Sequence, residues 1–218
     1  MSKDKPHIPP FFLTEALEFP PVETANTEGL LAVGGDLSPE RLLLAYQNGI
    51  FPWFNEDALI LWWCPDPRMV LFPDKIKISK SMRKILNGNQ FRLTRNTAFE
   101  AVIEACASVK RTDQTGTWIT REMKKAYLEL HIRGFAVSYE VWKADTLVGG
   151  LYGIDLGHIF CGESMFSLVS NASKYAFIRL AQDLDAKDYQ CVDCQLYTKH
   201  LASLGAEEIS RKTFMSML

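Results

Sequence analysis

The clearest hydrophobic pattern lies in the second half of the chain, where apolar residues alternate with polar ones. Over residues 135–141, Phe, Val, Tyr and Val occupy every second position, which predicts a strand with one buried face. A turn at 143–146 leads to the apolar, glycine-rich run 147–154, and a turn at 155–157 leads to the apolar run 157–167. These three segments predict an antiparallel meander.

A helical pattern follows this meander. Apolar residues keep helical spacing from 172 to 184, with Ser170 and Asn171 as candidate N-caps, and a short apolar run occupies 190–196. A strand–helix–strand unit makes a right-handed crossover between parallel strands. The sequence therefore predicts a mixed sheet and an α+β fold class.

The N-terminal third predicts shorter elements. A glycine-bounded apolar run at 29–35 predicts a strand, and Ser38 predicts the N-cap of a helix that ends near residue 49. An aromatic segment follows, and two prolines near residue 66 mark the expected boundary between domains. We expect a small N-terminal α/β domain over 1–66 and a larger domain over 67–218.

Basic residues gather around the first of three further predicted helices, which we place at 79–88, 96–108 and 120–133. Between Lys75 and Arg95 the chain has seven basic residues and no acidic one, although its net charge is −2. The charge pattern alone fits either a solvated helix face or a patch that contacts phosphate groups.

The composition is that of a globular protein, with 218 residues of which 47% are hydrophobic and 23% charged. The net charge argues against general affinity for nucleic acid, so any phosphate contact is expected to be local. The five cysteines are expected to be reduced, as in a cytoplasmic protein. We expect no signal peptide and no membrane span, because no apolar run approaches ~20 residues.

Polar residues interrupt the two strands that the crossover helix connects. Glu163 and Ser164 lie in the first strand, and Asp193 and Gln195 lie in the second. Carboxylates are rarely buried without a partner or a function. An exposed sheet edge would explain one acidic residue, but two acids and an amide on adjacent strands favour a functional site.

Other motifs point to no familiar chemistry. Cys191 and Cys194 have C-x-x-C spacing, but a structural zinc site needs a second pair of ligands and none has suitable spacing. Gly149, Gly150 and Gly153 lie within a predicted strand, which indicates close backbone packing and not a phosphate loop. We therefore expect no metal and no cofactor.

Long blocks of sequence between residues 19 and 209 resemble the leucyl/phenylalanyl-tRNA–protein transferase family. The blocks include NTEGLLAVGGDLSPERLLLAYQNGIFPWF, ILWWCPDPRMVLFP, VGGLYGI, IFCGESMFS and DCQ. The resemblance implies a small N-terminal domain, followed by an acyl-CoA N-acyltransferase-like C-terminal domain with a meander and a β–α–β crossover. It also implies transfer of leucine, phenylalanine or methionine from aminoacyl-tRNA to the N-terminal arginine or lysine of acceptor proteins, which marks them for N-end rule degradation.

The family motifs carry over to particular residues. They imply that Asp193 and Gln195 orient the attacking amine or assist proton transfer, and that Glu163 binds the cationic acceptor residue. The aminoacyl and adenosine pocket would be formed by Tyr46, Trp53, Trp118, Leu151, Phe160 and Met165. The basic helix would bind tRNA through Lys77, Lys80, Arg83 and Lys84. Leu151 departs from the methionine that is common in this family, so the preference between leucine and phenylalanine stays open.

Two other functions compete with this interpretation. An acetyl-CoA-dependent small-molecule N-acyltransferase should have a glycine-containing pyrophosphate loop before the crossover helix, but residues 167–174 contain no glycine. A non-catalytic RNA-binding protein would explain the basic helix and leave Glu163 and Asp193 without a function. We expect a cytoplasmic monomer whose partners are aminoacyl-tRNA and acceptor proteins.

Overall fold

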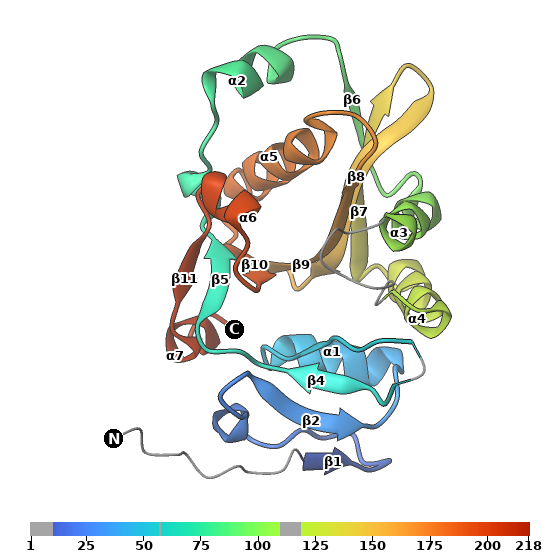
Figure 1. Cartoon of the computed structure of the whole chain (residues 1–218), viewed down its shortest axis with the longest axis vertical. Coiled ribbons are helices and arrows are strands. Elements are labelled where there is room, and N and C mark those ends of the chain that lie inside the picture. Colours follow the sequence, from blue (N-terminus) through green and yellow to red (C-terminus); the bar gives the residue numbers. More distant parts are fainter. Residues whose placement is uncertain (1–10, 57, 110–118) are drawn as a thin grey trace.

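The computed structural model of the chain describes residues 11–56, 58–109 and 119–218. In this part of the chain the strands form two sheets, a four-stranded sheet from residues 11–63 and a seven-stranded sheet from residues 68–209. Figure 1 shows the smaller sheet at the bottom with its helix, and the larger sheet with helices on both sides above it.

The larger sheet is mixed and contains the predicted meander. Its strand order is β11-β5-β10-β9-β8-β7-β6. The strands are β5 (Arg68–Leu71), β6 (Arg92–Arg95), β7 (Ala136–Lys143), β8 (Thr146–Asp155), β9 (Ile159–Ser167), β10 (Cys191–Gln195) and β11 (Glu207–Ile209). β9 and β10 pair in parallel and all other neighbours are antiparallel, which confirms the predicted meander, crossover and α+β class.

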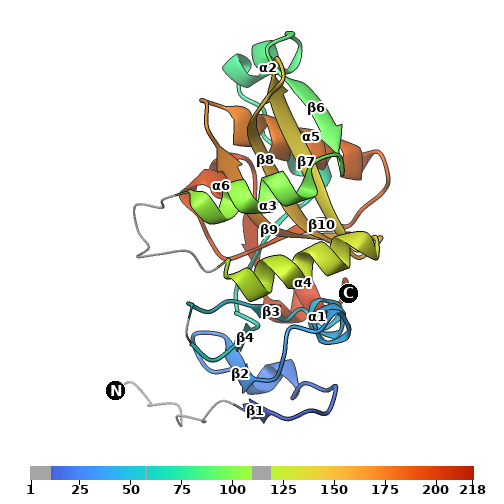
Figure 2. The same cartoon turned by 90° about the vertical axis from the view of Figure 1, so that its right-hand side faces the viewer.

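Helices cover both faces of this sheet (Figures 1 and 2). One face packs against α3 (Phe99–Ser108) and α4 (Arg121–Ile132), and the other packs against the crossover helix α5 (Ala172–Asp185). The alternation in β7 explains the arrangement, because Val137, Tyr139 and Val141 all face the core on the α5 side. As predicted, Thr120 caps α4 by accepting a hydrogen bond from the backbone N–H of Met123 (3.2 Å).

The smaller sheet has the strand order β1-β2-β4-β3. Its elements are β1 (Phe11–Leu13), the 3-10 turn Val22–Thr24, β2 (Leu30–Gly34), α1 (Pro39–Gln47), β3 (Phe51–Pro52) and β4 (Leu61–Trp63). The side chain of Ser38 caps α1, as predicted, by accepting a hydrogen bond from the N–H of Arg41 (3.3 Å). A single hydrophobic core continues from this sheet into α3, α4 and the larger sheet.

Four short helical elements lie between or after the strands of the larger sheet. They are the 3-10 turn Pro73–Lys75, α2 (Lys80–Leu86), α6 (Lys199–Ser203) and α7 (Arg211–Met215). α7 returns to the smaller sheet, where the guanidinium of Arg211 donates a hydrogen bond to the carbonyl of Cys64 (2.8 Å). This hydrogen bond ties α7, near the end of the chain, to the residue that follows β4 of the smaller sheet.

α5 begins at Ala172 as predicted, but its expected side-chain cap is wrong, and so is the expected start of α3. Asn171 precedes α5 in the left-handed region (φ 69°) and makes no capping side-chain hydrogen bond; instead, the hydroxyl of Ser167 accepts from the N–H of Ser173 (3.2 Å). The helix predicted from residue 96 begins at Phe99, because Asn96 has φ 58° and its side chain accepts from the N–H of Ser138 in β7 (2.9 Å). Both asparagines adopt the left-handed backbone conformation of a turn, and neither side chain caps a helix.

The glycines of β8 confirm the expected close packing. A Cβ atom added to Gly153 would lie 2.2 Å from the carbonyl oxygen of Cys161, and one added to Gly149 would lie 2.5 Å from Cβ of Ala172. Neither position has room for a side chain, so the chain needs glycine here to bring β8 against β9 and α5.

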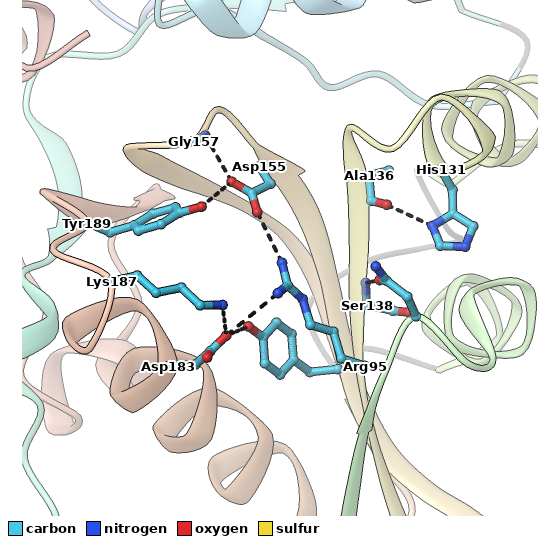
Figure 3. Close-up of polar contacts among 11 residues, drawn as sticks. Arg95, His131, Ala136, Ser138, Asp155, Gly157, Asp183, Lys187 and Tyr189 are labelled. Atoms are coloured by element: carbon cyan, nitrogen blue, oxygen red, sulfur yellow. Dashed lines mark hydrogen bonds and ion pairs between the residues drawn. The ribbon is translucent and has the colours of Figure 1, made fainter.

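A polar network links β6, β8, α5 and the segment before β10 (Figure 3). Arg95 from β6 donates a hydrogen bond to Asp155 (3.2 Å) and forms an ion pair with Asp183 of α5 (3.9 Å). Tyr189 donates to Asp155 (2.7 Å), and Lys187 donates to Asp183 (2.9 Å). Since these groups bond one another, we assign the network to stability and not to ligand binding.

Candidate active site

A cavity of about 510 Å³ lies between β8, β9, β10 and α5 and reaches β3 of the smaller sheet. One part of its wall, the apolar lobe, is formed by Leu151, Phe160, Met165, Phe177, Leu180 and Val192. Its polar wall contains Glu163 and Gln195, with Trp53 on the side of the smaller sheet and the exposed side chains of Leu196 and Tyr197 at the rim. The cavity therefore places an apolar lobe next to a carboxylate and an amide.

The half-buried carboxylate of Glu163 is held by groups from two other elements. Its Oε1 accepts a hydrogen bond from Nε2 of Gln195 (2.9 Å), and its Oε2 accepts one from the hydroxyl of Tyr127 in α4 (2.8 Å). Burial raises the pKa of Glu163 to about 7, although the hydrogen bonds from its neighbours lower that pKa. This carboxyl group therefore changes its charge near neutral pH.

β-Bulges present both polar side chains to the cavity. In β9, Gly162 pairs with Gly153 and Ser164 pairs with Tyr152, so Glu163 is the extra residue. In β10, the pairing with β5 likewise skips one residue before Gln195, whose φ of 64° lies in the left-handed region. Bulges re-aim side chains beside functional sites, and a residue other than glycine with positive φ is uncommon.

Asp193 lies behind the cavity, and its side chain is outside the cavity lining. Its carboxylate accepts two hydrogen bonds from Arg68 of β5, from Nε to Oδ1 (2.7 Å) and from Nη2 to Oδ2 (2.6 Å), and both side chains are 1% exposed. Oδ1 also accepts from the backbone N–H of Gln195 (3.0 Å). Asp193 therefore fixes the backbone that carries Gln195 and does not contact the cavity directly.

The guanidinium of Arg68 lies between two aromatic rings. Its Cζ is 4.8 Å from the ring centre of Phe51 in β3 and 4.7 Å from that of Phe214 in α7. A buried ion pair needs such enclosure and close geometry to offset the desolvation of its charges. This cation thus connects the smaller sheet, the last helix and the strand of Gln195.

Tyr46 also lies behind the cavity and not in its wall, because its side chain is 1% exposed. Its hydroxyl forms a short hydrogen bond with that of Tyr127. Burial raises the pKa values of Tyr46 and Tyr127 well above the usual value for tyrosine, so both hydroxyls keep their protons. Since Tyr127 donates its only proton to Glu163, it accepts from Tyr46.

The predicted tRNA-binding residues lie together on and before α2. Lys77, Lys80, Arg83 and Lys84 are all exposed, and Ser79 caps the helix as predicted. Among the residues that the structure describes, none of the four basic side chains forms an ion pair. Their charges are available to a partner.

The structure thus brings most of the predicted site residues together. Trp53, Leu151, Phe160, Glu163, Met165 and Gln195 line one cavity. Trp118 lies outside the described residues. Arg68 and Tyr127 were not among the predicted site residues. An arginine directly before the apolar run 69–72 is a sequence feature that could have indicated Arg68.

No group of three metal-ligating residues occurs within residues 11–56, 58–109 and 119–218. Cys191 and Cys194 are free thiols there, as are the other three cysteines, in agreement with the expectation of reduced cysteines. In the same ranges, no helix is long and apolar enough to span a membrane.

Comparison with protein families defines the class of the chain. Residues 70–218 match the family described as "Leucyl/phenylalanyl-tRNA protein transferase", and residues 35–66 match the N-terminal domain of that family. The chain is therefore an enzyme of the transferase class. Because the main match covers more than half of its length, the chain belongs to the leucyl/phenylalanyl-tRNA–protein transferase family.

Individual relatives agree with this assignment. The leucyl/phenylalanyl-tRNA–protein transferase of Flavobacterium johnsoniae is 62% identical over 95% of this chain and 98% of its own length. The corresponding protein of Christiangramia forsetii is 58% identical over 95% of this chain and 99% of its own. A solved GCN5-related N-acetyltransferase from Kribbella flavida covers 77% of this chain and 60% of that protein at 10% identity, with a TM-score of 0.38, a likeness too weak to define function.

Proposed function

We propose that the chain transfers leucine, phenylalanine or methionine from aminoacyl-tRNA to the N-terminal arginine or lysine of acceptor proteins. The observation that carries the proposal is the single cavity in which an apolar lobe adjoins the carboxylate of Glu163. The lobe suits the side chain of the donor amino acid, and the carboxylate suits a cationic acceptor side chain. The modified proteins would enter N-end rule degradation.

The donor side chain would occupy the apolar lobe. Leu151, Phe160 and Met165 line it, and these residues come from β8 and β9. Trp53 and Trp118 are assigned to the wall of the aminoacyl-adenosine site. Tyr46 was assigned to the same site, and its buried position supports an indirect role through Tyr127 and Glu163.

The acceptor would bind through its side chain and its α-amine. A guanidinium or ammonium group near Glu163 favours the ionised carboxylate, so acceptor binding would lower the pKa of Glu163 from about 7. The amide of Gln195, adjacent to this carboxylate, can orient the α-amine of the acceptor. Asp193 would act as a positioning residue, because it touches the backbone of Gln195 and not the cavity.

The reaction itself needs little beyond positioning. The neutral α-amine attacks the carbonyl carbon of the aminoacyl ester, a C–N bond forms and the C–O bond to the terminal ribose breaks. The ribose oxygen takes the proton that the amine loses. The amine has a pKa near ~8, so its neutral form is accessible at physiological pH. Because the ester is already activated, holding ester and amine at attack distance suffices and we propose no metal or cofactor.

The exposed basic residues of α2 would bind the donor tRNA through its phosphates. Lys80, Arg83 and Lys84 lie on one short helix, and Lys77 precedes it. Contacts with phosphates position a nucleic acid without reading its sequence, so the amino acid and not the tRNA body would decide selection. We further propose a cytoplasmic monomer with domains over 1–66 and 67–218.

The decisive experiment is transfer of radiolabelled leucine from leucyl-tRNA to a protein that begins with arginine. We expect label on the acceptor, and none on the same protein beginning with an uncharged residue. Acetylation of a small amine from acetyl-CoA in place of this transfer would support the acyltransferase alternative. Binding of tRNA without any transfer would support the non-catalytic alternative.

A further inference from the structure

A second hollow of about 350 Å³ is lined by residues on or next to α2, α5 and α6. Lys77, from the segment before α2, and Lys174, from the first turn of α5, both line it. The remaining lining is apolar or carries a serine hydroxyl. Among the residues that the structure describes, the hollow is therefore lined by two lysines and by no acidic residue.

Neither lysine is neutralised in the part of the chain that the structure describes. Lys75, close to Lys77 in sequence, forms an ion pair with Glu207 at 2.7 Å, but neither Lys77 nor Lys174 forms one. Two unpaired ammonium groups at one hollow favour an anion with several acceptor oxygens, and a phosphate group is the anion that the proposed substrate carries.

Only one short helix separates this hollow from the active-site cavity. Ser203 and Leu204, at the end of α6, line the hollow, while His200 and Leu201, at its beginning, line the cavity. At ~1.5 Å per residue the two sets are about 5 Å apart along the helix axis. Burial, together with the charge of Lys174, lowers the pKa of His200, which agrees with this proximity.

We propose that the hollow binds a backbone phosphate of the single-stranded 3′ end of the donor tRNA, held by Lys174 and Lys77. The inference rests on the proposed function. When the aminoacyl ester is in the cavity, the strand that carries it must leave toward the basic residues of α2. The hollow lies between the cavity and α2, and positive grooves that follow the backbone are how proteins hold single strands.

The test compares three donors that carry the same leucine. They are leucyl-tRNA, a leucylated trinucleotide with the sequence of the tRNA 3′ end, and leucyl-adenosine, which has no phosphate. We expect Lys174→Gln to raise KM for the first two donors about three- to fivefold, the upper range for a partly exposed charge pair, and to leave KM for leucyl-adenosine unchanged. Lys174→Arg should restore both values.

Two matched variants separate this site from its neighbours. Lys143→Gln removes an exposed lysine at the β7–β8 turn and should change none of the three values. The triple variant Lys80→Gln, Arg83→Gln, Lys84→Gln should weaken leucyl-tRNA but not the trinucleotide, because α2 would contact the double-helical stem.

Each other outcome has a definite meaning. An unchanged KM for the trinucleotide in Lys174→Gln would overturn the inference, and so would an equal rise for leucyl-adenosine, which would place Lys174 inside the cavity. If the unaltered enzyme transferred leucine from none of the donors, the proposed function itself would fail.

Discussion

Gln195 donates a hydrogen bond from Nε2 to Oε1 of Glu163 across 2.9 Å, so the residue that follows the bulge in β10 fixes the bulged residue of β9. Further bonds extend this contact on both sides, through the backbone of Gln195 to Asp193 and through Glu163 to Tyr127. The carboxylate of Glu163 is thus held by groups from a strand and a helix, which is the rigidity that the proposed positioning mechanism needs.

The first prediction concerns acceptor binding. Glu163→Gln should raise KM for arginine-initiated acceptors at least tenfold, because a charge-assisted hydrogen bond to the acceptor cation is lost. The Kd for leucyl-tRNA, measured by filter binding, should stay within twofold. Glu208→Gln, which neutralises an exposed glutamate of β11, is the control for charge. An equal loss in both measurements would refute the assignment of Glu163 to the acceptor.

The second prediction concerns pH and stability. The pKa of Glu163 is raised from 4.5 to about 7, so between these values the native protein holds a proton that the unfolded chain has lost. This contribution to stability is complete below pH 4.5 and is lost as pH rises through 7. Glu163→Gln should therefore gain about 1–2 kcal/mol relative to the unaltered protein between pH 5.5 and pH 8, measured by urea unfolding. A difference that does not vary with pH would contradict the raised pKa.

The third prediction concerns the basic helix. Neutralising Lys80, Arg83 and Lys84 together should weaken tRNA binding and reduce the slope of log Kd against log salt by up to about three phosphate contacts. The measurement is a salt titration of leucyl-tRNA binding from low to physiological ionic strength. If the slope did not change, these residues would be only a solvated face of α2.

The fourth prediction concerns the choice of donor. Leu151 lines the apolar lobe, is 3% exposed and pairs with Met165 across the two strands. Leu151→Met gives this wall a more flexible side chain, so it should change the ratio of leucine to phenylalanine transfer by about tenfold, near the lower end of the ~1–3 kcal/mol that one methylene is worth. Competition between charged tRNAs at fixed acceptor concentration measures the ratio. Transfer of isoleucine or valine as efficiently as leucine would refute selection by shape.

The sequence predicted the parts of the fold that have strong periodicity. The meander from β7 to β9 and the crossover helix α5 follow directly from alternation and helical spacing. β5 was missed, because its four residues, Arg68–Leu71, follow an aromatic and proline-rich segment and are buried throughout, which leaves no alternating pattern. The start of α3 and the capping of α5 depend on side chains that bond to other segments, and local sequence does not contain that information.

The sequence predicted the members of the site better than their arrangement. Glu163 and Gln195 were recognisable as polar residues within apolar runs, and both line the cavity. Strict alternation would place Asp193 and Gln195 on the same face of β10, but the bulge between them turns Gln195 to the cavity and leaves Asp193 facing Arg68. A one-residue bulge has no signature in a single sequence, so the indirect position of Asp193 could not be predicted.

The enclosure of Arg68 between Phe51 and Phe214 affects when, during synthesis of the chain, the enzyme can become active. A ribosome adds ~5–20 residues per second, so it would add Phe51 and Arg68 long before Phe214. The interval between Arg68 and Phe214 then lasts about 7–30 s, during which the guanidinium of Arg68 behind β10 is enclosed on one side only. Chains arrested before α7 emerges should therefore be inactive, and a nascent enzyme would begin to modify other proteins only when its own synthesis is nearly complete.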